Sequence, residues 1–254
     1  MADLAMGRGG SFDIGRVIER TFGVVGANFL TLFGLSLVLA ALPQAVTALA
    51  MAPGADGMPD FSPLWALGSL VTFVAAFLLQ ASIVHASIVD LNGGKASFAD
   101  SLRVGLSHFL PVLGISILMS IALVFGFLLL VVPGVMMAIA WVVAVPVQVV
   151  EKTGVIQSFG RSAQLTRGSR WSIFGLFFVY LLLALAFMIV GGLIFGVLSV
   201  MTGGPEGLVT RAIFSPLLNA VASMIGASGA AAIYYELRSK KEGVGPQELA
   251  AVFD

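Results

Sequence analysis

The chain of 254 residues is 59% hydrophobic and only 10% charged, whereas roughly 25% of the residues in an average soluble domain are charged. So few charged side chains cannot cover the surface of a soluble fold, and a formal net charge of zero argues against a nucleic-acid partner. The absence of cysteine excludes disulfides, thiolate metal sites and cysteine nucleophiles.

Five long stretches contain no Asp, Glu, Lys or Arg: residues 21–55, 61–89, 104–150, 171–205 and 212–235. About 20 apolar residues cross the hydrocarbon core as a helix, so four of these stretches hold one helix each. The 47 residues of 104–150 would form a helix about 70 Å long and must fold back, with a turn expected at Pro133-Gly134. Six spanning helices are expected, at roughly 28–52, 64–90, 109–132, 135–150, 171–201 and 209–236.

The basic residues test this count independently. With a cytoplasmic amino terminus, twelve of the thirteen Lys and Arg residues fall on the inside, and only Arg211 falls on the outside. This is a strong positive-inside bias. It predicts six helices with both termini cytoplasmic.

The predicted fold class is all-α integral membrane, with six transmembrane helices arranged as three hairpins. Apolar residues at helical spacing precede the first, third and fifth spans, so each hairpin is expected to follow a cytoplasmic-side amphipathic helix. In the third of these helices the apolar face is expected to be Val155, Ile156, Phe159 and Ala163. The chain is treated as one polytopic domain, 1–254: an amphipathic segment (1–27), a six-helix bundle (28–236) and a short cytoplasmic tail (237–254). The first apolar stretch is expected to stay in the mature protein, because a long segment with acidic residues precedes it.

Two groups of residues resemble a known family. The first group is Val132-Pro133-Gly134-Val135, Trp141, Pro146, Glu151, Gly154, Arg161-Ser162, Leu165, Gly168 and Trp171. The second is Tyr234-Tyr235-Glu236-Leu237-Arg238, followed by Lys241-Glu242-Gly243. Together they resemble a signature of bacterial membrane proteins that are similar to the membrane domain of glycerophosphoryl diester phosphodiesterases. The resemblance implies a six-helix fold in the bacterial cytoplasmic (inner) membrane and brings no mechanism.

Phosphodiesterase activity does not follow from this resemblance. That chemistry belongs to a separate soluble barrel, where paired histidines and carboxylates hold a divalent metal. This chain has only His85 and His108, without an acidic cluster beside them. We therefore expect no enzyme activity, no catalytic residue, no cofactor and no metal.

Several polar residues in or beside the spans are candidate structural or functional groups. They are His85, Asp90, Glu151, Arg161, Arg170, Asn219, Glu236 and Arg238. His85 is the only ionisable residue well inside a span, which suggests either a bond to a neighbouring helix or a proton or ligand role. Glu151 is expected to form a charge clasp with Lys152, Arg161 and Arg170, and Glu236 and Arg238 a similar one.

Four amides lie within the apolar stretches: Gln44, Gln80, Gln148 and Asn219. They can either line a polar path or form hydrogen bonds between helices.

Six arginines on the amphipathic segments are candidates for binding lipid headgroups: Arg16, Arg20, Arg103, Arg161, Arg167 and Arg170. Each basic residue near an anionic surface contributes about 1 kcal/mol. The alternative is that these arginines only set orientation and pair with nearby acids.

Two classes of function fit these observations. The first is a non-catalytic scaffold or accessory subunit concerned with lipid organisation. The second is a small transporter or channel for a neutral or lipidic substrate. The expected partners are membrane lipids, anionic ones among them, and a membrane-protein partner or a second copy of the chain.

Overall fold

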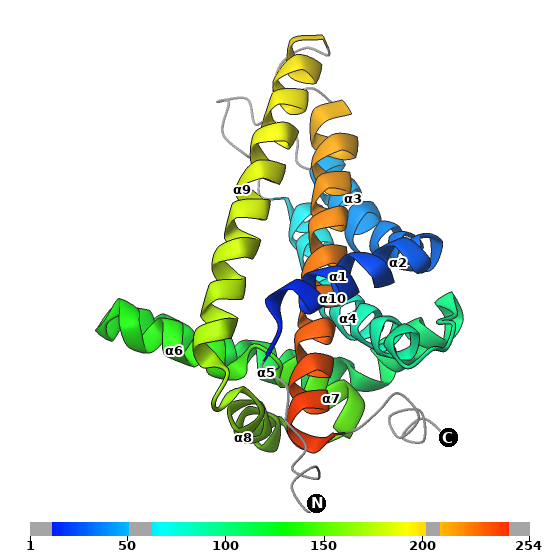
Figure 1. Cartoon of the computed structure of the whole chain (residues 1–254). Coiled ribbons are helices and arrows are strands. Elements are labelled where there is room, and N and C mark those ends of the chain that lie inside the picture. Colours follow the sequence, from blue (N-terminus) through cyan, green and yellow to red (C-terminus); the bar gives the residue numbers. More distant parts are fainter. Residues whose placement is uncertain (1–11, 51–61, 202–208, 244–254) are drawn as a thin grey trace, which may run out of the picture.

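A computed structural model describes residues 12–50, 62–201 and 209–243, and in these residues all regular structure is helical (Figure 1). The α-helices are α1 (Ile14–Ala27), α2 (Phe29–Ser36), α3 (Leu42–Ala50), α4 (Pro63–Leu91), α5 (Phe98–Leu129), α6 (Val131–Trp141), α7 (Ala144–Glu151), α8 (Val155–Thr166), α9 (Arg170–Met201) and α10 (Ser215–Glu242). Two short π-helices, η1 (Leu37–Ala41) and η2 (Thr210–Phe214), precede α3 and α10.

The expected number of apolar helices is confirmed. Among the described residues, six helical stretches are long and apolar enough to cross a membrane: Phe29–Ala50, Pro63–Leu91, Phe98–Leu129, Val131–Glu151, Arg170–Met201 and Ala212–Glu242. The chain is thus a multi-pass membrane protein by length and composition. The last helix continues to Glu242, so it extends into the segment that the sequence assigns to the tail.

The long uncharged stretch does fold back, but its turn lies earlier than predicted. Leu130 alone is extended (φ −166°, ψ 150°), and α6 begins at Val131. Pro133 and Gly134 therefore lie in the first turn of α6. Proline is tolerated there because an amide hydrogen in the first turn has no partner within the helix.

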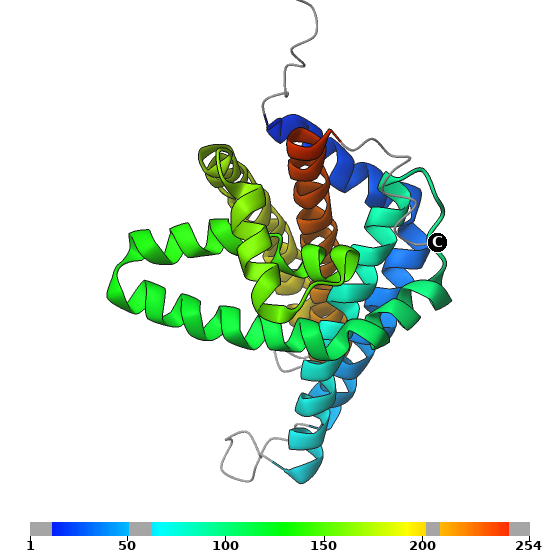
Figure 2. The same ribbon diagram turned by 90° about the horizontal axis from the view of Figure 1, so that it is seen from below.

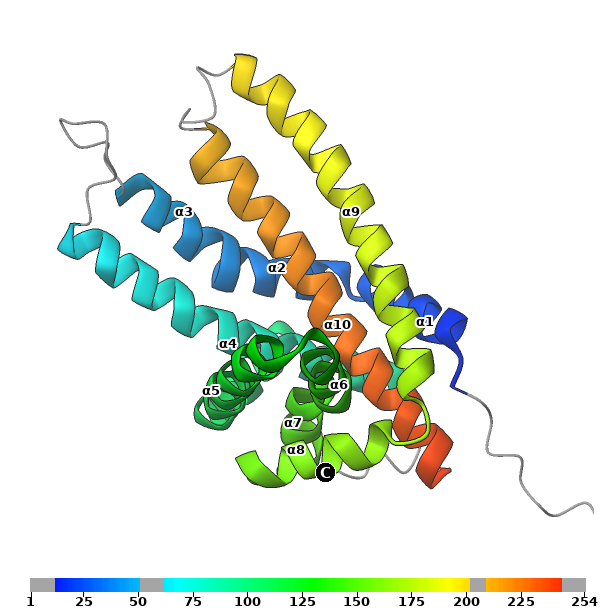
Figure 3. The ribbon, with the colours of Figure 1, turned by 90° about the vertical axis from the view of Figure 1, so that its left-hand side faces the viewer.

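The first hairpin (α2 to α4) and the third hairpin (α9 and α10) point in one direction, and the second hairpin (α5 and α6) crosses them. Figure 3 shows α3, α4, α9 and α10 from the side, fanning toward the same end of the molecule, whereas α5 and α6 are seen nearly end-on. Figure 2 shows the α5–α6 hairpin extending sideways from the other helices. The arrangement of three hairpins that cross the membrane together thus stays a prediction.

Each π-helix ends two residues before a proline, Pro43 or Pro216. A proline inside a helix clashes with the carbonyl four residues earlier, and a wider π turn relieves that clash. The two wide turns lie close to each other's helices, since η1 contacts α10 and η2 contacts α3. They determine how the residues just after the prolines face one another.

The main core consists of buried residues of α4, α7 and the carboxyl-terminal half of α10, to which α1, α5, α6, α8 and α9 add one or two residues each. Helix α1 crosses α10 (Figure 1) and buries Val17, Thr21 and Val24. Two residues of the predicted apolar face of α8, Val155 and Phe159, pack against the core, whereas Ile156 is 71% exposed. The fully buried positions of α8 are Ser158, Ser162, Leu165 and Thr166. Small hydroxyl residues suit this contact, since the Ser162 hydroxyl donates to the buried carbonyl of Ala140 at 2.8 Å.

Candidate functional site

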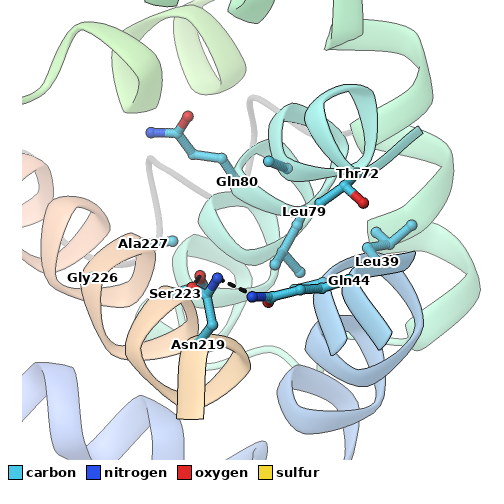
Figure 4. A pocket seen from close by; sticks show the side chains of 11 residues that line it. Leu39, Gln44, Thr72, Leu79, Gln80, Asn219, Ser223, Gly226 and Ala227 are labelled. Carbon is cyan, nitrogen blue, oxygen red and sulfur yellow. Dashed lines mark hydrogen bonds between the residues drawn. The ribbon is translucent and has the colours of Figure 1, made fainter. Parts of the chain in front are cut away.

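A polar pocket lies between the η1–α3 segment, α4 and α10, within three of the apolar helices (Figure 4). Its volume is about 290 Å³, close to the lower limit for small-molecule sites. Its polar lining residues are Gln44, Thr72, Gln80, Asn219 and Ser223. We call it the amide pocket.

The π turns bring two of the amides together. Gln44 directly follows Pro43, and Asn219 lies one turn beyond the start of α10. The Asn219 side-chain amide donates to the Gln44 oxygen at 3.0 Å, and the Ser223 hydroxyl donates to the Asn219 oxygen at 3.4 Å. Figure 4 shows these three side chains turned toward one another.

The pocket keeps hydrogen-bonding capacity that the protein itself does not use. The Gln80 amide forms no hydrogen bond with any described residue, and neither does the Gln44 amide nitrogen. An unpaired amide in an apolar environment costs several kcal/mol. All the lining residues are uncharged. The arrangement therefore suits an uncharged polar group.

The sequence identified three of these residues but not their convergence. Gln44, Gln80 and Asn219 line one pocket, whereas Gln148 lies elsewhere and accepts a hydrogen bond from the Ser158 hydroxyl at 3.1 Å. Sequence reasoning missed Thr72, because a hydroxyl in an apolar helix commonly bonds its own backbone. Thr72 does so, donating to the Gly68 carbonyl at 2.9 Å.

An apolar groove of about 480 Å³ lies beside the amide pocket, between α9 and α10. Helix α9 lines it with Phe177, Tyr180, Leu183 and Phe187, and α10 lines it largely with small residues. Gly226 lines both the amide pocket and this α9–α10 groove. A Cβ atom at Gly226 would meet nothing within 4 Å, so the glycine opens onto free space.

Near the end of α10, Glu236 binds α1. The Glu236 side chain is only 3% exposed, and its carboxylate accepts from Arg16 at 3.1 Å and from Arg20 at 2.5 Å. The Arg20 guanidinium also lies over the Tyr235 ring, 4.8 Å from its centroid. The sequence analysis predicted a charge clasp of Glu236 and Arg238 from their closeness in the chain. It did not identify Arg16 and Arg20 of α1 as the partners of Glu236.

A second acid, Glu151, holds α8 against the bundle. Arg161 donates to Glu151 at 2.8 Å and also binds Glu242, and the Tyr234 hydroxyl donates to Glu151 at 3.0 Å. Burial lowers the pKa of Arg161, but its hydrogen bonds to the two carboxylates raise the pKa by more, and the guanidinium stays charged. Three basic residues were predicted to pair with Glu151. Arg161 does form this ion pair, whereas Lys152 and Arg170 form no ion pair with described residues.

Arg238 belongs to the same group of charges. It donates to Glu242 at 2.9 Å and to the Tyr234 hydroxyl at 3.0 Å.

The remaining candidate residues lie apart. His85 is 7% exposed, within two turns of the end of α4, and lines a separate pocket with Asp100 and His108. Asp90 accepts from the Asn28 amide at 2.6 Å.

Three arginines of the headgroup set, Arg103, Arg167 and Arg170, form no ion pair with described residues, whereas Arg16, Arg20 and Arg161 are occupied by acids.

Among the described residues, no group of three His, Asp or Glu side chains lies close enough together to hold a metal ion. Comparisons with protein-family models, with curated proteins and with solved structures find no match to this chain, so the assignment of a function rests on its own residues.

Proposed function

We propose that this chain is a non-catalytic multi-pass membrane protein that binds a lipid with an uncharged headgroup. The polar headgroup occupies the amide pocket, and an acyl chain occupies the α9–α10 groove. The observation that carries this proposal is the junction of the two sites at Gly226, which places a polar and an apolar cavity side by side on adjoining faces of α10.

The chemistry of the amide pocket selects the headgroup. Gln80 offers a side-chain amide that has no partner among the described residues and can both donate and accept hydrogen bonds, and the Gln44 amide nitrogen offers further donors. Hydroxyl and ester oxygens of a glyceride satisfy both kinds of group. A phosphate does not suit the pocket, because no basic residue lines it and a charge buried without a partner is strongly unfavourable.

The groove suits an acyl chain. Aromatic and aliphatic side chains of α9 face small residues of α10, which leaves an elongated apolar space. Tyr180 has a polar end there, but its hydroxyl lies 2.9 Å from the Thr21 hydroxyl and is satisfied within the protein.

The further expectations from the sequence belong to this proposal. The six helices form three hairpins in the bacterial inner membrane, both termini are cytoplasmic, and amphipathic segments such as α1 and α8 lie along the inner surface. A relation to the membrane domain of glycerophosphoryl diester phosphodiesterases, which the two groups of residues suggest, is part of the same proposal and brings no mechanism. Movement of the bound lipid between leaflets would make the protein a transporter, the second class of function.

A scaffold role is the alternative that one specific observation favours. Ion pairs of Glu236 and Glu151 hold α1 and α8 on one end of the bundle. Such a fixed, polar end can present a surface to a membrane-protein partner or to a second copy of the chain.

Native mass spectrometry of the full chain in mild detergent tests the lipid proposal, with dioleoylglycerol as the probe. Wild-type protein is expected to retain the probe. Gly226→Leu fills the junction and should lose it, whereas Gly192→Leu should retain it. Gly192 is the matched control, since it is an exposed glycine of α9 that lines neither cavity and has nothing within 4 Å of a built Cβ.

A second variant separates binding from folding. Gln80→Leu removes an amide that forms no hydrogen bond with a described residue, so it should leave thermal stability unchanged and weaken retention of the probe. Equal retention by wild type, Gly226→Leu and Gln80→Leu would refute the lipid proposal.

A further inference from the structure

A second polar pocket, of about 420 Å³, lies where the end of α4, the first turns of α5 and the end of α7 meet. We call it the Arg103–Lys152 pocket. Its polar lining residues are His85, Asp100, Arg103, Ser107, His108 and Lys152. It shares no residue with the amide pocket or the α9–α10 groove, so a ligand in this pocket is independent of the proposed function.

The two basic residues of this pocket keep their charges available. Arg103 and Lys152 are exposed and form no ion pair with described residues. Two nearly buried acids, Glu236 and Glu151, form their ion pairs with other arginines, Arg20 and Arg161 respectively.

The one acid in the pocket is already engaged. The Asp100 carboxylate accepts from the Ser97 hydroxyl at 2.5 Å, and the Asp100 amide donates back to that hydroxyl at 3.1 Å. This exchange caps the start of α5, where the helix dipole also favours a carboxylate. Arg103 and Lys152 supply two positive charges against the one engaged carboxylate, so the lining is net positive.

Lys152 has an unusual backbone for a lysine. It is the only non-glycine residue with positive φ in the described part of the chain, at 51°, and it ends α7 by donating its amide to the Gln148 carbonyl at 3.1 Å. Glycine or asparagine is usual at such a position, because the left-handed conformation is strained for other side chains. Residues held in that conformation gather at functional sites. Here the residue with this backbone conformation is one of the two cations that line a polar pocket.

We propose that the Arg103–Lys152 pocket binds a phosphate group. Arginine and lysine recognise phosphate as a fork of donors and as a point charge. The pocket lies at the ends of α4 and α7 and in the first turns of α5, where the uncharged stretches of these helices begin or end. The phosphate comes from an anionic lipid headgroup or from solution.

Protection of a cysteine from labelling tests the site directly. Val104→Cys places one thiol in the wall of the pocket without replacing a polar lining residue, in a chain that has no other cysteine. The full chain in phosphatidylcholine nanodiscs is labelled with a water-soluble maleimide, with inorganic phosphate or with chloride at equal ionic strength. A parallel set of nanodiscs contains phosphatidic acid. The ligand is expected to slow labelling.

Two variants remove the charges separately. Lys152→Asn retains a residue that tolerates the left-handed conformation, and Arg103→Gln alters an exposed side chain. Each should weaken the apparent affinity about fivefold, which is about 1 kcal/mol at 1.4 kcal/mol per tenfold. Lys95→Asn is the control, since Lys95 is exposed between α4 and α5 but does not line the pocket.

The outcomes distinguish the sources of phosphate. Protection by inorganic phosphate assigns the site to a free phosphate, and protection by phosphatidic acid alone assigns it to a lipid headgroup. Absence of protection by either, protection unchanged in both variants, or an equal loss in Lys95→Asn would overturn the proposal.

Discussion

Replacement of Arg20 by glutamine should release α1 from α10 far more often than the same replacement of Arg16. Glu236 is 3% exposed, whereas the Arg20 side chain is 26% exposed and the Arg16 side chain 51% exposed. Removing one partner of a buried ion pair costs about 3–5 kcal/mol, and an exposed pair contributes about 0–1 kcal/mol. Because Arg16 remains beside Glu236, we expect Arg20→Gln to cost about 2–3 kcal/mol, including the cation–π contact with Tyr235. Arg16→Gln should cost at most about 1 kcal/mol.

Labelling of a buried cysteine measures this local opening. Val17 is fully buried on α1, so Val17→Cys reacts only when α1 leaves the bundle. At 1.4 kcal/mol per tenfold, Arg20→Gln should accelerate labelling about 30- to 150-fold, and Arg16→Gln at most about fivefold. The double variant Glu236→Gln, Arg20→Gln should label more slowly than Arg20→Gln alone, because it removes the buried carboxylate that Arg20→Gln leaves with the exposed Arg16 as its one arginine partner. Equal rates for the two single arginine variants would refute the reasoning.

Four other predictions concern topology, packing and activity. A cysteine at Gly57, which lies outside the described residues, should label only from outside and one at Lys95 only from inside; the opposite pattern would invert the topology. A cysteine at Leu130 should label from outside if the α5–α6 hairpin crosses the membrane, and failure to label from either side would contradict three spanning hairpins. Gly105→Ala should lower the thermal midpoint by the equivalent of about 1–3 kcal/mol, because its Cβ would lie 2.8 Å from a backbone oxygen of α4, whereas Gly23→Ala, in open space, should not. Purified protein should not release glycerol phosphate from a phosphodiester, and metal-dependent release would overturn the non-catalytic assignment.

The number of apolar helices could be predicted because the bilayer sets a length and a composition for each span. Local partners were also within reach: Glu151 and Arg161 are ten residues apart, and their ion pair is present. The predicted turn at Pro133-Gly134 lies a few residues after the observed turn at Leu130. Pro-Gly is a strong turn signal, but proline is also frequent in the first turn of a helix.

Contacts between residues far apart in the chain could not be predicted from the sequence. Gln148 looks no different from Gln44 or Asn219 along the chain, yet it lies outside the amide pocket. Gln44 and Asn219 lie in α3 and α10, which contact each other, whereas Gln148 lies in α7. Glu236 and Arg20 are 216 residues apart, and no periodicity connects them.

Photo-crosslinking by a diacylglycerol tests the central claim most directly. The probe carries a diazirine on one acyl chain and is added to wild-type protein in membranes, and the modified peptides are mapped. If the groove holds an acyl chain, adducts concentrate on its α9 and α10 residues, such as Phe187 and Ile225, unlabelled diacylglycerol competes with them, and Gly226→Leu abolishes them. Adducts that are spread over all exposed apolar positions, with the α5–α6 tip at Leu128 and Leu129 labelled as strongly as the groove, would contradict lipid binding at this site.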